Sequence, residues 1–219
     1  MRKKIIMRKI ITVLTMMALI PCYGQNHFVG LKGGIGTTNI NPSFLSDTEN
    51  RIGFNYGLTY DYQLNKKFNI GVEFLYFQKG FSNEIIFTDA LGKPTFSSSI
   101  KTNLDYFAMP LKGGFLFGNK ITGFVNLGII PALLLEAKSI IPATEGLTEE
   151  STSYDIDYIR KVELGGLIEV GANYKIASNF LLSTACGFHH SITSIIEGSN
   201  SRNYGIVLSI GLKYALKRE

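Results

Sequence analysis

The sequence predicts an all-β protein, a single eight-stranded antiparallel barrel with up-and-down topology that crosses a membrane. Three observations lead to this prediction. Long segments alternate between apolar and polar side chains, which is the two-residue period of a strand with unlike faces. The connections between these segments are alternately long and short. The polar faces consist mainly of Gly, Asn, Ser and Thr, whereas a water-exposed face favours Lys and Glu.

The clearest alternation lies in residues 54–78, FNYGLTYDYQLNKKFNIGVEFLYFQ. Apolar and aromatic side chains fill one face of each half, and the break at 65–67 (Asn-Lys-Lys) is typical of a tight turn. The opposite, polar face carries Asp61 and Glu73. We therefore expect a long hairpin with one apolar face and one polar face.

The direction of these faces distinguishes a soluble barrel from a membrane barrel. An outer-membrane barrel turns its apolar side chains to lipid and its polar ones inward. The apolar faces are long enough for a tilted transmembrane strand of about 9–11 residues, and a closed barrel leaves no unpaired backbone in lipid. Aromatic residues also mark both ends of the apolar bands, as in aromatic girdles: Tyr60, Tyr62, Tyr174 and Tyr214 at one end, and Phe54, Tyr76 and Tyr204 at the other. We therefore predict apolar side chains outside and polar side chains within.

Eight strands are predicted along the chain, at residues 28–36, 54–64, 68–78, 104–117, 121–137, 160–174, 179–190 and 204–217. Four longer polar segments are predicted as extracellular loops, at 37–51, 80–101, 138–158 and 191–203. The short connections at 65–67, 118–120 and 175–178 are predicted as periplasmic turns.

Two prolines oppose this assignment. Pro110 and Pro131 lie inside predicted strands, where each removes a hydrogen bond from the ladder. The segment IIPALLL, residues 129–135, is apolar on both faces, so a buried or membrane helix over 122–137 is an alternative. Gly123, Gly128 and Pro131 weaken a helix there, and we favour the strand.

The N-terminus is typical of a secretory signal peptide. Basic residues precede an apolar run at 10–20, and Pro21-Cys22-Tyr23-Gly24 follows. The apolar run is about half of the roughly 20 residues that a spanning helix needs. Lipid attachment at Cys22 is an alternative that the neighbouring Pro21 disfavours. We predict a signal peptide at 1–24 and a barrel domain at 25–219, exported to a bacterial outer membrane.

Charge and cysteine content exclude other classes of protein. Five of the 22 basic residues precede Ile10, and the remaining 17 equal the 17 acidic residues, so no basic patch for nucleic acid is indicated. Beyond the signal peptide, Cys186 is the one remaining cysteine, so no internal disulfide is expected.

Six charged residues fall on the predicted interior face: Asp61, Glu73, Lys112, Glu163, Glu169 and Lys213. An eight-stranded barrel is just wide enough for side chains to fill, and buried charges need partners. We therefore favour a salt-bridged plug over a path for protons or ions.

His189 and Ser191 lie at the long-loop end of a predicted strand and are candidate catalytic residues. Nucleophilic catalysis requires a base within reach and an acid that orients the base. Glu197 is close in the sequence and is only a candidate for this acid, so no orienting acid is assigned. We expect no enzyme activity, with a lipid-modifying enzyme as the alternative.

No cofactor or metal is expected. The acidic segment 145–157 could hold Ca²⁺ or contact lipopolysaccharide, but its spacing does not match a calcium-binding loop, and a solvated loop is the expectation. Expected partners are outer-membrane lipid and lipopolysaccharide, with envelope or secretion-system proteins as further candidates. We expect no nucleic acid and a monomer.

Several segments resemble the PorT-type outer-membrane β-barrel proteins of Bacteroidetes. The matching pieces are GLKGG at 30–34, YQL at 62–64, VEFLYFQKGF at 72–81, LDYFAMPLKGGF at 104–115 and GLKY at 211–214. Family members often carry Arg where Ala185 stands, and often end at an aromatic residue, whereas five residues follow Tyr214 here. The resemblance implies an eight-stranded barrel similar to OmpX and OmpA, and an outer-membrane location. The resemblance implies little about activity, although the protein that gives the family its name is associated with a protein-secretion system. We expect a structural, interaction or secretion-accessory role, with a narrow pore or transporter as a further alternative.

Overall fold

The computed structural model describes residues 27–41, 48–141, 151–154 and 158–216, and every regular element within these ranges is a β-strand. The strands are β1 (His27–Asn41), β2 (Thr48–Gln63), β3 (Phe68–Thr88), β4 (Pro94–Ala108), β5 (Leu111–Phe117), β6 (Ile121–Ile141), β7 (Ser151–Tyr154), β8 (Val162–Lys175), β9 (Phe180–Ser191) and β10 (Arg202–Leu216). The predicted signal peptide lies outside the described residues. No helix in the described part of the chain has the length and hydropathy needed to cross a membrane.

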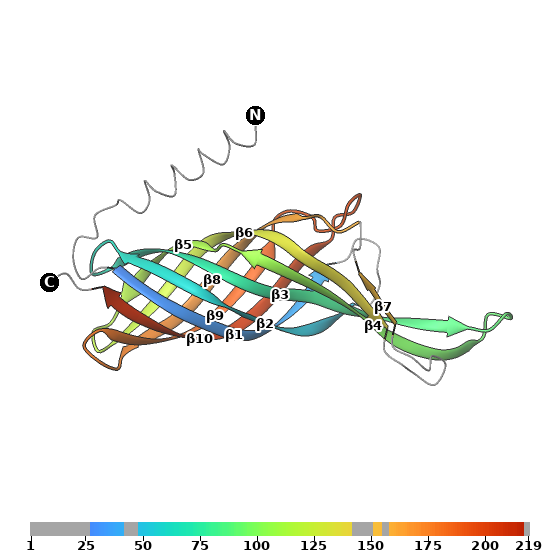
Figure 1. Cartoon of the computed structure of the whole chain (residues 1–219), viewed down its shortest axis with the longest axis horizontal. Helices are drawn as coiled ribbons and strands as arrows, with labels where there is room; N and C mark the ends of the chain where they lie inside the picture. The colour runs from blue at the N-terminus through green and yellow to red at the C-terminus, as the bar shows by residue number, and fades with distance from the viewer. Residues whose placement is uncertain (1–26, 42–47, 142–150, 155–157, 217–219) are drawn as a thin grey trace, which may run out of the picture.

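Antiparallel pairing closes the strands into a ring. β1 pairs with both β2 and β10. From β10 the order runs through β9, β8 and β6 to β3, and β3 pairs with β2, which closes the ring. β4 and β5 together fill one place in the wall, because both pair with β3 on one side and β6 on the other. β7 pairs with the outer end of β6. The wall therefore has eight strands, as predicted, and Figure 1 shows them tilted along an elongated barrel.

The two faces of the wall point as the alternation predicts. On β2, the side chains of Phe54, Tyr56 and Leu58 are exposed, whereas Asn55 and Asp61 are buried. The same pattern recurs on β10, where Ile206, Leu208, Ile210 and Leu212 are exposed outward. The surface around the ring is thus apolar and the bore is largely polar, which is the arrangement that lipid requires.

The bore is not polar throughout, which differs from the prediction. In the half near the long loops, Leu104 and Tyr106 of β4 and Ile130 and Ala132 of β6 are buried inside the barrel. This explains why residues 129–135 are apolar on both faces: one face meets lipid and the other meets the apolar cluster inside the barrel. The alternative helix over 122–137 is wrong, because β6 is continuous across Pro131.

The predicted strand 104–117 is interrupted, and the prolines lie at the interruption. β4 ends at Ala108 and β5 begins at Leu111. The N–H of Met109 donates to the carbonyl oxygen of Pro131 (2.9 Å), and that of Glu73 donates to the carbonyl oxygen of Pro110 (3.0 Å). Both missing proline donors therefore lie at a break in the ladder, where proline is tolerated.

The predicted loop at 80–101 is wrong. β3 continues to Thr88 and β4 begins at Pro94, and the two strands pair from Phe87 with Phe96 inward to the barrel. The connecting turn is held by Asp89, whose Oδ1 accepts the N–H groups of Leu91 (2.8 Å) and Lys93 (2.9 Å). Figure 1 shows this hairpin extending well beyond the barrel. We call residues 84–99, which form its outer part, the β3–β4 ribbon.

Candidate functional site

The bore is occupied by charged side chains that reach inward from the wall. Four lysines and four carboxylates meet there in three groups: Lys32 of β1, Asp61 of β2, Glu73 and Lys79 of β3, Lys112 of β5, Glu163 and Glu169 of β8, and Lys213 of β10. Positive and negative charges balance in this set. Balance matters because an unpaired charge in a low-dielectric interior is strongly destabilising.

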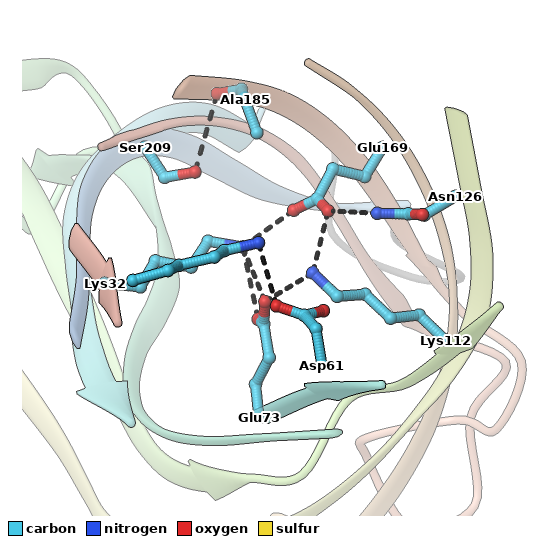
Figure 2. Close-up of polar contacts among 9 residues, drawn as sticks. Lys32, Asp61, Glu73, Lys112, Asn126, Glu169, Ala185 and Ser209 are labelled. Carbon is cyan, nitrogen blue, oxygen red and sulfur yellow. Dashed lines mark hydrogen bonds and ion pairs between the residues drawn. The ribbon is translucent and has the colours of Figure 1, made fainter. Parts of the chain in front are cut away.

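The central group is a square of alternating charges. Lys32 Nζ lies 3.1 Å from Glu73 Oε1 and 2.7 Å from Glu169 Oε2. Lys112 Nζ lies 2.5 Å from Glu73 Oε1 and 2.9 Å from Glu169 Oε1. Asn126 Nδ2 donates a further hydrogen bond of 2.9 Å to Glu169 Oε1. Figure 2 shows these side chains converging from opposite walls, so that the network closes the bore at this level.

The outer group is centred on Glu163, which is almost completely buried. Lys79 Nζ lies 2.6 Å from Glu163 Oε1, and the Ser191 hydroxyl donates to the same oxygen at 2.5 Å. Asn203 Nδ2 donates to Glu163 Oε2 at 3.0 Å. The ammonium of Lys79 also lies 5.1 Å from the ring centroid of Tyr106, within cation–π range. Glu163 is thus satisfied on both oxygens.

The inner group lies nearest the short turns. Lys213 Nζ is 2.8 Å from Asp61 Oδ2, and both side chains are slightly exposed. The same ammonium lies 5.8 Å from the ring centroid of Phe124. This pair lines a cavity of about 110 Å³ at the short-turn end of the barrel.

An apolar cap covers the outer group. The connection between β9 and β10 turns inward and buries Ile195 and Ile196 completely or nearly so. Ile159 forms an isolated bridge with Ile196, and both pack in one cluster with Ile40 at the end of β1. The N–H of Ile195 donates to the Ser201 carbonyl oxygen (2.9 Å), which holds the turn. The loop predicted at 191–203 is therefore partly a plug.

The six predicted interior charges all project into the bore, but they do not form one cluster. Glu73, Lys112 and Glu169 meet in the central group, Glu163 belongs to the outer group, and Asp61 and Lys213 form the inner pair. The sequence reasoning missed two lysines that complete the pairs, Lys32 and Lys79. The alternation of faces already places both lysines inward. Lys32 follows Leu31, which faces outward, and Lys79 is two residues beyond Phe77, which faces inward.

The two candidate catalytic residues lie inside the bore, beneath the cap. Ser191 is fully buried and its hydroxyl is bound to Glu163, not to His189. His189 is 3% exposed and stacks edge-on against Phe77, and its Nε2 has no hydrogen-bond partner among the described residues. Glu197 is exposed, and Glu163 is the acid beside Ser191. Among the described residues, His189 therefore makes no hydrogen bond to Ser191 that would let it act as the serine's base.

The structure provides little space for a solute between the charge groups. A cavity of about 30 Å³ lies between the outer and central groups, and one of about 10 Å³ lies between the central and inner groups. Each is about the size that admits one or a few water molecules. No cluster of three metal-ligating side chains occurs among the described residues. The acidic segment at 145–157 lies mostly outside them, apart from β7.

The architecture and the filled bore define a class, the small outer-membrane β-barrels. The model of the family described as outer membrane protein beta-barrel domain matches residues 23–197, and the chain belongs to this family. Its location is therefore the outer membrane, as predicted. The search of curated protein sequences found no match.

Several solved structures are similar to this chain. Neisserial surface protein A is 11% identical, with a TM-score of 0.50, over 87% of this chain and 97% of that protein. The outer membrane protein OprG from Pseudomonas aeruginosa is 12% identical, with a TM-score of 0.45, over 89% and 98% of the two chains. Ail, the attachment invasion locus protein of Yersinia pestis, is 13% identical, with a TM-score of 0.44, over 86% and 99%.

Proposed function

We propose that the protein is a non-conducting outer-membrane barrel that presents its β3–β4 ribbon to another component of the cell envelope or surface. The observation that carries this proposal is the occupied bore. Ion pairs cross the interior at three levels, and the apolar cap closes its outer end. A barrel filled in this way contacts other molecules through its surface.

The β3–β4 ribbon is the described surface that best suits such contact. β2 pairs with β3 only as far as Thr48 with Asn83, and β4 pairs with β6 only from Lys101 with Ile140. The described ladder of residues 84–99 thus joins β3 to β4 and to no third strand. Exposed strand edges are templates for pairing with another chain, and Leu91 at the tip is 83% exposed.

A secretion-accessory role in a PorT-type protein of Bacteroidetes is a more specific form of the same proposal. It rests on the sequence resemblance, above all VEFLYFQKGF at 72–81. The structure adds a physical role for three positions in this motif, because Glu73, Phe77 and Lys79 all point into the bore. These residues fill the interior of the barrel. The motif is therefore stronger evidence for the family fold than for a secretion-system partner.

The two alternatives are less compatible with the site. A lipid-modifying enzyme needs a nucleophile that lipid can reach, and Ser191 is buried and hydrogen-bonded to Glu163. A pore or transporter needs a connected path, and the described cavities between the charge groups are small. We therefore favour an interaction role.

Conductance tests the first half of the proposal. The purified barrel is inserted into planar bilayers beside a wide porin that reports successful reconstitution. We expect no steady single-channel current, because three layers of ion pairs and the cap block the bore. Large and steady currents from the folded barrel would refute the proposal.

Site-specific photo-crosslinking in intact cells tests the second half. A photoreactive residue replaces Leu91 at the ribbon tip, and in a matched variant it replaces Ile121, which faces lipid near the short turns. We expect a discrete protein adduct from position 91 and none from position 121. Adducts at neither position, or the same adduct at both, contradict the proposed role of the ribbon.

A further inference from the structure

The short-turn end of the barrel carries exposed charge of a single sign. Each of its three turns has lysine in it or directly beside it, and Figure 1 shows these turns at the end opposite the β3–β4 ribbon. The β2–β3 turn contains Lys66 and Lys67, the β5–β6 turn contains Lys120, and Lys175 ends β8 at the β8–β9 turn. We call these four residues the lysine rim.

The lysine rim has no counter-charge within the described part of the chain. All four side chains are exposed, and none of them forms an ion pair with a described residue. The turns themselves, residues 64–67, 118–120 and 176–179, contain no Asp or Glu. Short turns face the periplasm in outer-membrane barrels, so the rim presents net positive charge on that side of the membrane.

Charges in the rest of the described barrel are mixed in sign. Inside the bore, lysines and carboxylates pair in equal number, down to the Asp61–Lys213 pair nearest the short turns. At the outer end, acidic and basic side chains lie together, as in the pair of Glu136 with Lys138 (3.5 Å). The positive surface of the lysine rim is therefore a local feature of one end, and its partner should be anionic.

The lysine rim lies where the lipid-facing band ends. Phe68 directly follows Lys67, and Tyr174 directly precedes Lys175. Aromatic residues of this kind lie at the interface between hydrocarbon and headgroups. The stem of a lysine lies along apolar surface while its ammonium reaches the polar layer. Exposed apolar side chains flank every lysine of the rim: Leu64, Phe68, Phe117, Ile121, Tyr174 and Ile176.

The distribution of the lysines favours lipid over a protein as the anionic partner. The three turns connect β2 to β3, β5 to β6 and β8 to β9, so they are spread around the closed ring of strands. A layer of lipid surrounds the whole ring, whereas a protein docked at one side would meet only part of it. A lysine ammonium is a compact charge with three donors, which suits the phosphate oxygens of a headgroup.

We propose that the lysine rim binds anionic phospholipids in the inner leaflet of the outer membrane, through ion pairs between its ammonium groups and the headgroup phosphates. These contacts hold the short-turn end at the level of the headgroups. The lysine rim lies at the opposite end of the barrel from the β3–β4 ribbon, and its role does not depend on the interaction role of the ribbon.

Electron spin resonance of the lipids beside the folded barrel tests the proposal. The barrel is reconstituted in phosphatidylcholine vesicles with a trace of phosphatidylglycerol or phosphatidylcholine, each spin-labelled at the same acyl carbon. The motionally restricted part of the signal measures the lipid that contacts the protein. We expect a preference for phosphatidylglycerol of about fivefold at a site beside one lysine. The preference should fall toward one in 1 M salt, where the Debye length is about 3 Å.

Matched variants assign the preference to the lysine rim. In one variant, Gln replaces all four lysines of the rim. In the control variant, Gln replaces four exposed basic residues of the outer end: Lys93, Lys101, Arg160 and Lys161. Both variants lose four positive charges, and heat-modifiable gel mobility checks that both are folded. We expect the preference to disappear in the rim variant and to persist in the control variant.

Two results would overturn the proposal. The first is the absence of a lipid preference in the parent barrel, which requires no substitution, or an equal loss of preference in the two variants. The second is a parent barrel without lipid preference that forms a discrete protein adduct in intact cells from a photoreactive residue at Asn119, which is exposed in the β5–β6 turn. That result would assign the rim to a protein partner.

Discussion

At the scale of single residues, Lys79 and Glu163 show how the interior tolerates charge. Both side chains are 1% exposed, and they lie 2.6 Å apart in a region otherwise lined by Leu104, Tyr106 and Phe77. The attraction offsets the cost of desolvation because Ser191 and Asn203 complete the coordination of the carboxylate. Removal of either charge leaves the other buried without its partner.

Single and double substitutions of this pair have distinct expected outcomes. Glu163→Leu and Lys79→Met should each lower the free energy of unfolding by about 3–5 kcal/mol. The double variant should be more stable than either single variant, although Ser191 and Asn203 still lose their acceptor. Urea unfolding of the barrel in lipid vesicles, followed by heat-modifiable gel mobility, measures the difference.

An exposed charge provides the control for this cycle. Glu84 is exposed on the β3–β4 ribbon, so Glu84→Gln should change the free energy of unfolding by no more than about 0.5 kcal/mol. Strictly additive losses in the double variant would contradict the pairing of Lys79 with Glu163.

At the scale of elements, the β3–β4 ribbon behaves as an addition to the barrel rather than as part of its wall. In the described ladder, residues 84–99 pair only with one another, and an isolated two-stranded hairpin is only marginally stable. Replacement of residues 84–99 by Asn-Gly would join Asn83 to Ile100 through a two-residue hairpin turn.

We expect this shortened chain to fold into the barrel as completely as the parent, because every pairing of β2 and β6 is retained. Heat-modifiable mobility after refolding into vesicles measures the folded fraction. The crosslinked adduct expected from the ribbon tip should disappear together with the ribbon. Failure of the shortened chain to fold would show that the ribbon is required for the wall itself.

The ribbon also shows why some boundaries could not be predicted. Residues 84–99 lack the regular apolar–polar alternation of the barrel strands, and without it a strand that extends past the barrel has the composition of a loop. The division of the predicted strand at Met109 and Pro110 was equally hidden. Whether a proline interrupts a strand depends on which neighbour its missing donor faces, and only the pairing decides that.

At the scale of the whole molecule, the apolar outer surface predicts how the barrel sits in the membrane. Leu208 lies near the middle of β10 and is 59% exposed, whereas Ile176 lies in the β8–β9 turn with similar exposure. Leu208→Arg should lower the free energy of unfolding by about 2–4 kcal/mol, whereas Ile176→Arg should lower it by about 0–1 kcal/mol, because the cost depends on depth in the bilayer.

Refolding titrations of both variants in vesicles measure this contrast. Equal costs at the two positions would mean that the membrane band does not lie where the outer face places it. The same substitution chemistry at both sites removes the contribution of Arg itself from the comparison.

The sequence by itself determined the barrel, its eight strands, the direction of its faces and the inward position of Asp61, Glu73, Lys112, Glu163, Glu169 and Lys213. These follow from alternation along each strand, a local property that lipid imposes from outside. Only the tertiary structure decided which lysine meets which carboxylate, that Ile195 and Ile196 fold inward as a cap, and that the short-turn end is hollow. Such contacts depend on the stagger of strands around the closed ring and on how a loop packs into the bore, and no local pattern carries that information.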